Sequence, residues 1–108
     1  MASIFEHSNV FRFHEKVEYS TEGIVSKQVL DRPVGNVTLF AFDKGQRLST
    51  HSAPFDAMVQ VMEGTAEIVI NDQPFTLQAG ESIIMPAGIP HAVNATEKFK
   101  MVLTMIKG

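Results

Sequence analysis

Hydrophobic positions along this chain form short runs rather than long segments with helical spacing. Five prolines and seven glycines break the sequence about every ten residues. The runs between them are rich in valine, isoleucine, phenylalanine and threonine, which favour strands. The pattern therefore predicts an all-β domain, a sandwich or a barrel, built from about eight to ten strands.

The clearest expected strands are Ile24–Leu30, Asn36–Phe42 and Phe99–Ile106. In the second of these, Val37, Leu39 and Ala41 alternate with residues that include two phenylalanines. Successive side chains of a strand point to opposite faces, so bulky groups lie on both faces here. We expect both faces to be covered.

The middle of the chain predicts three further strands, the last two of which form a hairpin. Residues Ala57–Met62 read AMVQVM and are followed by Glu63-Gly64, where the pattern is interrupted. Ala66–Ile70 and Pro74–Leu77 then flank Asn71-Asp72. Both turn residues tolerate positive φ, so we expect a two-residue hairpin. AMVQVM is apolar on both faces, so either the N-terminal residues or a second subunit should cover its outer face.

Residues 1–21 predict an arm or short strands, and residues 22–108 predict a single domain. The chain has 108 residues, 44% of them hydrophobic and 19% charged, with a formal net charge of −3. No cluster of basic residues stands out, so nucleic acid is not an expected partner. No signal peptide or long apolar run is present, so no membrane partner and a cytoplasmic location are expected. The absence of cysteine excludes disulfides, thiolate metal sites and cysteine nucleophiles.

Two segments carry spacings that resemble the cupin family. The first family motif has glycine, two histidines, a glutamate and a second glycine, and the second has glycine, proline, glycine and histidine. The positions here that correspond to the two motifs are Gly45, His51, Ala53, Ala57 and Gly64, then Gly80, Pro86, Gly88 and His91. This resemblance implies a cupin double-stranded β-helix, or jelly-roll barrel.

The same resemblance implies a site of three histidines and one carboxylate for Mn, Fe, Ni or Zn. Here Ala53 stands at the second histidine and Ala57 at the glutamate, so His51 and His91 remain as the metal ligands. Strand parity places residues 51 and 53 on one face, and the motif directs residues 57 and 91 to the same cavity. All four residues are expected to line it. Any divalent transition metal should bind weakly, because catalytic sites use three protein ligands.

Other residues offer less to such a site. Asp56 is out of phase with Ala57 and is expected to cap the turn of residues 52–55. Gln60 shares the phase of Asp56 and should also face away from the cavity. His7 and His14 are expected to be ordinary surface histidines.

Three functional hypotheses follow. The first is a barrel that binds a small molecule, in a cavity made more apolar by the two alanines. The alternative is a metal-dependent enzyme of the dioxygenase, isomerase or lyase type that uses His51 and His91. The third is an interaction module without a ligand. Small cupins pair through strands such as AMVQVM, so a homodimer is expected.

Overall fold

The computed structural model describes residues 5–107, and within that range the protein is all-β, as predicted. A short 3-10 helix, η1 (Phe13–Glu15), precedes the first strand. The eight strands within this range are β1 (Ile24–Arg32), β2 (Gly35–Phe42), β3 (Arg47–His51), β4 (Asp56–Ile70), β5 (Gln73–Gln78), β6 (Ser82–Met85), β7 (His91–Asn94) and β8 (Phe99–Ile106). No helix within residues 5–107 has the length and apolar character needed to span a bilayer.

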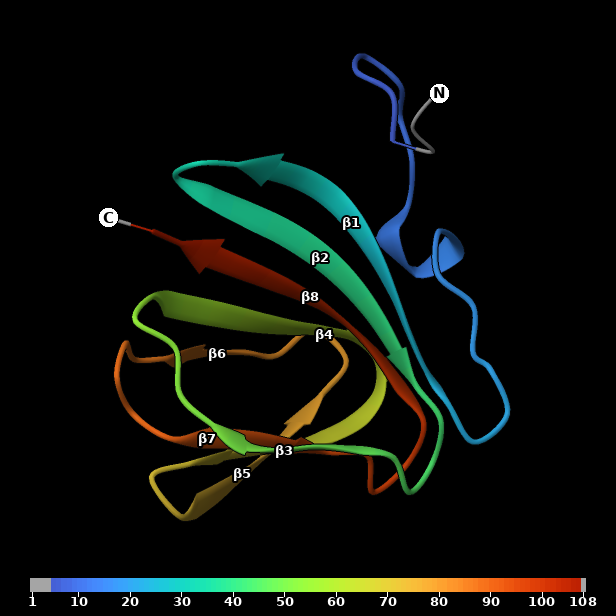
Figure 1. Ribbon diagram of the computed structural model, residues 1–108. Helices are drawn as coiled ribbons and strands as arrows, with labels where there is room; N and C mark the ends of the chain where they lie inside the picture. The colour runs from blue at the N-terminus through green and yellow to red at the C-terminus, as the bar shows by residue number, and fades with distance from the viewer. Residues whose placement is uncertain (1–4, 108) are drawn as a thin grey trace.

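The strands form one antiparallel sheet that curls into a half-open barrel (Figure 1). The strand order is β1-β2-β8-β4-β7-β3, with β5 and β6 also paired to β4. One wall, wall A, comprises β1, β2, β8, β6 and the first part of β4. The opposite wall, wall B, comprises β3, β7, β5 and the second part of β4. This curled sheet confirms the expected jelly-roll class.

Strand β4 runs through both walls, so the break expected at Glu63-Gly64 is wrong. The strand is continuous over 15 residues, with a bulge in its pairing to β8 between Val61 and Glu63. Gly64 has a φ of +79°, in a region that side-chain-bearing residues rarely adopt. A bulge and a glycine bend a strand without ending it. Here they carry β4 from wall A into wall B.

The predicted hairpin is confirmed. Asn71 and Asp72 have φ values of +50° and +66° and join β4 to β5. Ile70 pairs with Gln73, so the turn contains two residues. Both central residues have the positive φ that matches the twist of the flanking strands.

The main hydrophobic core lies inside the curl, between the two walls. Inward residues of β4 include Val59 and Ile68, both fully buried. The rings of Phe42 and Phe99 stack with centroids 4.6 Å apart, joining β2 to β8 from the inside. Such a pair combines a large buried area with a favourable offset geometry.

A second core lies on the outer face of wall A, under the N-terminal segment. Phe5 and Val17 from that segment pack against Leu39, Ala41 and Val102. Met62 is partly buried against the same cluster. The expectation that β2 is covered on both faces is therefore confirmed. At Met62, part of the outer face of AMVQVM is covered by the chain's own N-terminal residues.

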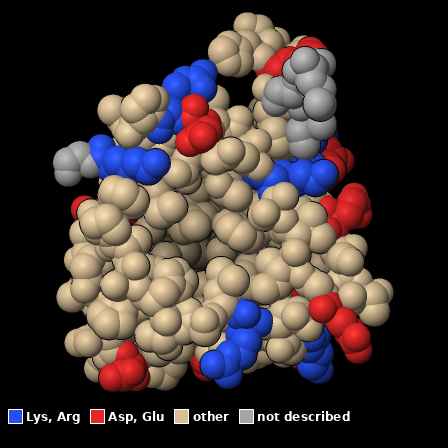
Figure 2. Space-filling model, in the orientation of Figure 1, with Lys and Arg blue, Asp and Glu red and all other residues tan. Residues whose placement is uncertain are grey.

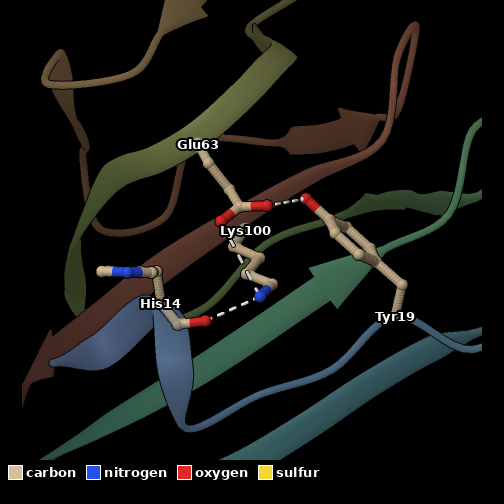
Figure 3. A network of polar contacts seen from close by, with 4 residues as sticks. All are labelled: His14, Tyr19, Glu63 and Lys100. Atoms are coloured by element: carbon tan, nitrogen blue, oxygen red, sulfur yellow. Dashed lines mark hydrogen bonds and ion pairs between the residues drawn. The ribbon is translucent and has the colours of Figure 1, made fainter.

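A polar network holds the N-terminal segment in place (Figure 3). The Tyr19 hydroxyl donates to Glu63 at 2.7 Å, and the buried Lys100 ammonium donates to the backbone carbonyl of His14 at 2.6 Å. Lys100 also lies 3.7 Å from the Glu63 carboxylate. Burial, followed by the contact with Glu63, raises the pKa of Tyr19, so the phenol stays protonated and donates.

Candidate functional site

His51 and His91 lie side by side at the junction of two strands of wall B. His51 ends β3, His91 begins β7, and the two residues are register partners. Their rings meet edge to face, with centroids 4.4 Å apart and an interplanar angle of 69°. His91 also pairs with Ile70 on its other side. The structure therefore brings the two sequence-predicted histidines together.

Backbone carbonyls fix the orientation of both rings. Nδ1 of His51 lies 2.8 Å from the carbonyl oxygen of Ser49, and Nδ1 of His91 lies 3.3 Å from that of Ile89. A carbonyl oxygen can only accept a hydrogen bond, so Nδ1 must carry the proton in each pair. We therefore assign a proton to Nδ1 of both rings, so that the Nδ1–H tautomer is the one present whenever a ring is neutral. The lone pair of each ring is then on Nε2.

The loop before His91, residues 86–90, is tied to its surroundings at three points. The Gly88 N–H donates to the carbonyl of Ala53 at 2.8 Å, and the Asn71 N–H donates to the carbonyl of Pro90 at 2.9 Å. The Ala87 N–H donates to Oδ1 of Asp56 at 2.9 Å. These bonds position His91 at the start of β7.

The contact of Asp56 corrects one sequence-based expectation. Its carboxylate accepts a hydrogen bond from the loop that precedes His91, rather than capping the turn at residues 52–55. The phase expectation is confirmed, because Asp56 and Gln60 are both exposed while Ala57 between them is buried. The pattern of residues around Asp56 could not have indicated this contact, because Ala87 lies 31 positions further along the chain.

The two alanines differ in position. Ala57 is 3% exposed and lies inside the barrel in register with Met85 and Met105. Ala53 lies beyond the end of β3, so the parity argument that paired it with His51 does not apply. The carbonyl of Ala53 instead accepts from Gly88, which joins the His51 segment to the His91 loop.

A hollow opens between the two walls, surrounded by residues that are neither acidic nor basic (Figure 2). Several inward hydrophobic side chains there remain only partly buried, although they pack against the main core. They are Phe40, Leu48, Ile70, Ile83, Leu103 and Met105. Incomplete burial of inward side chains is what an open barrel interior produces. The inward side chains are thus mostly apolar, and on wall B His91 is buried whereas its neighbour His51 is exposed.

Sequence reasoning missed the polar residues on the inner face of β2. Thr38 is in register with Leu103, and Asn36 with Met105, so each shares a row with an inward residue of β8. Both are partly buried and uncharged. The signal was the alternation in β2, where threonine and asparagine take the same phase as the inward Phe40 and Phe42.

The site has few of the groups that hold a metal. No cluster of three or more histidine, cysteine, aspartate or glutamate side chains suited to a metal ion occurs within residues 5–107. His51 and His91 supply two imidazoles, whereas catalytic metal centres use three protein ligands. Two imidazoles alone do not make up the site of three histidines and one carboxylate that the family resemblance implies.

The remaining two histidines lie elsewhere. His7 and His14 are exposed on the N-terminal segment, which packs on the outer face of wall A. The surface assignment made from the sequence is confirmed for both. His91, by contrast, is 6% exposed, and desolvation followed by the neighbouring His51 lowers its pKa.

Comparisons with known proteins agree with this geometry. A family model described as a cupin domain matches residues 38–107. A conserved protein of unknown function from Streptococcus pyogenes is 38% identical, with a TM-score of 0.92, covering 100% of this chain and 96% of that chain. A cupin 2 conserved barrel domain protein from Leptotrichia buccalis is 44% identical, with a TM-score of 0.88, covering 90% of this chain and 47% of that chain.

A third similar structure is a cupin superfamily protein from Desulfitobacterium hafniense. It is 20% identical, with a TM-score of 0.90, and the match covers 96% of this chain and 95% of that chain. At that identity it supports the fold alone. No curated protein matches the chain.

Proposed function

The chain belongs to the cupin superfamily, and from that premise we propose that it binds a small molecule in the hollow between walls A and B. The binding residues in this proposal are His51, Ala53, Ala57 and His91. The observation that carries it is the pair of adjacent imidazoles, with ring centroids 4.4 Å apart, on a barrel whose inward side chains are mostly apolar. Ligand sites combine largely apolar walls with a few convergent polar groups.

The rest of the barrel supports this reading. The loop of residues 86–90 is held by two backbone–backbone hydrogen bonds and one to the Asp56 carboxylate, so the polar part of the site is built before a ligand arrives. The stacked pair Phe42 and Phe99 belongs to the same core and is fully buried. A preformed polar group beside mostly apolar walls is typical of small-molecule sites.

A fragment screen by two-dimensional ¹H–¹⁵N NMR tests the proposal. Small aromatic fragments should shift the backbone resonances of His51, Ala53, Ala57 and His91 together. The variant His51→Leu should change these shifts, whereas the control His14→Leu, on the exposed N-terminal segment, should leave them as they are. Shifts confined to the outer face of wall A would place binding elsewhere and contradict the proposal.

The second candidate is a metal-dependent enzyme of the dioxygenase, isomerase or lyase type, with His51 and His91 as ligands to Zn, Mn, Fe or Ni. It is favoured by the proximity of the two rings, each with an unprotonated Nε2. Elemental analysis of untagged protein separates the candidates. A stoichiometric transition metal that disappears in His51→Leu would favour the enzyme, and protein free of metal would favour the binding barrel.

We also propose that the chain forms a homodimer through the uncovered part of wall A. Met58 lies on the outer face of β4 and pairs with Ile84 of β6, which is 62% exposed. Ile106, at the end of β8, is 61% exposed near the same strand. Neighbouring apolar side chains left in water favour a partner surface.

A further inference from the structure

The Nε2 atoms of His51 and His91 both lack a hydrogen-bond partner among residues 5–107. The contact that fixes each ring uses Nδ1. Within residues 5–107, the hydrogen bond to a backbone carbonyl through Nδ1 is the one side-chain hydrogen bond that each of these rings makes. No buried side-chain nitrogen or oxygen in the described part of the chain is without a partner. His51 is exposed, and Nε2 of His91 is not among the buried atoms that lack a partner, so both Nε2 atoms are accessible to water or to a ligand.

Both free nitrogens are acceptors. Because Nδ1 carries the proton in each ring, Nε2 presents a lone pair and no hydrogen. Two acceptors cannot bond to each other, so the pair is complemented only by a group that brings donors. A carboxylate or phosphate would place its own lone pairs against them. Leaving a desolvated acceptor unpaired carries a penalty that such ligands could not avoid.

We propose that the histidine pair selects a neutral ligand with an apolar body and a polar head that carries two hydrogen-bond donors, such as a primary amide or a vicinal diol. This inference rests on the proposed function and specifies the ligand class of the same site. Two donors on one head match two acceptors whose rings lie 4.4 Å apart. The apolar body matches Leu103 and Met105, which stay partly exposed in the interior.

The charge distribution around the hollow supports the exclusion of anions. Lysine and arginine side chains lie toward the rim of the face seen in Figure 2, away from the hollow. Selective anion sites supply charge-assisted donors such as arginine or backbone N–H groups. While they are neutral, the rings of His51 and His91 provide no charged donor for an anion.

Three probes of nearly the same shape test the inference: benzamide, benzoate and toluene. Benzamide carries two N–H donors, benzoate replaces them with a charge and no donor, and toluene has no polar head. Titrations are followed by NMR at about pH 8, where imidazoles with ordinary pKa values are neutral, in buffer with a metal chelator. We expect benzamide to bind at least about tenfold more tightly than either of the others, equal to about 1.4 kcal/mol.

Variants assign this preference to the histidines. In His51→Leu with His91→Leu, toluene should still bind, and the advantage of benzamide over toluene should disappear. The control His14→Leu should keep the preference. The side-chain ¹⁵N shifts of the parent protein give a test that needs no ligand, because protonated and unprotonated ring nitrogens have well-separated resonances. Both rings should show Nδ1 protonated and Nε2 unprotonated.

The outcomes distinguish failure of the inference from failure of the proposed function. If toluene binds but benzoate binds as well as benzamide, the cavity is real and the donor rule is wrong. If the ¹⁵N shifts show protonated Nε2 atoms, the donor rule is wrong whatever binds. If none of the three probes perturbs the resonances of His51 or His91, both proposals fail.

Discussion

Gly64 is the position where a single added methyl group should disturb the barrel most. Its φ is +79°, and a Cβ built there would overlap the carbonyl oxygen of Lys98 and lie 2.8 Å from Cα of Phe99. Both obstacles are backbone atoms of the segment paired with β4, so neither can rotate away. Gly64→Ala therefore requires β4 and β8 to move apart at the bend that carries β4 between the walls.

The cost has two parts that can be separated. A left-handed conformation costs an alanine roughly 1–2 kcal/mol relative to glycine. Forcing the strands apart adds about 1–3 kcal/mol, the range for inserting atoms into a packed interior. Gly88→Ala is the matched control, because Gly88 has a φ of +77° and nothing within 4 Å of an added Cβ. It should lose only the conformational part.

Urea denaturation of the parent and the two variants at 25 °C measures the difference. A domain of this length has a free energy of unfolding of about 5–15 kcal/mol, so losses of these sizes are resolvable. We expect Gly64→Ala to lose about 2–5 kcal/mol and Gly88→Ala about 1–2 kcal/mol, with unchanged m-values. If Gly64→Ala were no more destabilised than Gly88→Ala, the close approach of β4 to β8 at this glycine would be wrong.

Four further outcomes are expected. Ala53→His with Ala57→Glu should raise Zn²⁺ or Mn²⁺ affinity by orders of magnitude in calorimetric titrations, because it restores the missing ligands, and unchanged affinity would contradict the assumed cavity geometry. Met58→Asp should weaken the homodimer in sedimentation equilibrium, and a parent that is monomeric at micromolar concentration would refute the dimer. Because the pKa of His91 is lowered in the folded protein, the unfolded chain binds the His91 proton more readily. The contribution of neutral His91 to stability is therefore complete above about pH 6.5 and is lost as the pH falls toward the lowered pKa. In denaturation curves, His91→Leu should reduce the dependence of stability on pH in this range. Lys100→Met should cost about 1–3 kcal/mol and speed proteolysis of the N-terminal segment, and an unchanged cleavage rate would show that the network does not hold this segment.

The sequence alone determined most of the strands, the hairpin at Asn71-Asp72 and the class of fold, but it missed β3 and the continuity of β4. Alternating apolar residues bounded by glycine and proline are local signals, because each depends on the conformation of a few neighbouring residues. Asn71 and Asp72 were predicted correctly for this reason. His51 and His91 were located by their spacing within two segments that share the pattern of a known family.

Only the tertiary structure decided what those residues face. The bulge after Val61 reverses the phase of β4, so that Glu63 joins the outer face and reaches Tyr19 and Lys100. In the sequence the same place read as the end of a strand, because a bulge depends on the register with β8, a strand more than thirty residues further along the chain. Long-range pairing of this kind leaves no mark in the local pattern of apolar residues.

The chemistry of the histidine pair was decided in the same way. Spacing could place two imidazoles in one interior, but the proton on each ring is set by the carbonyls of Ser49 and Ile89, which lie within hydrogen-bonding distance only once β3 and β7 have formed. The sequence determined which groups are present. The fold determined which nitrogen of each ring is hydrogen-bonded to a backbone carbonyl, because that contact depends on backbone atoms whose positions no residue type specifies.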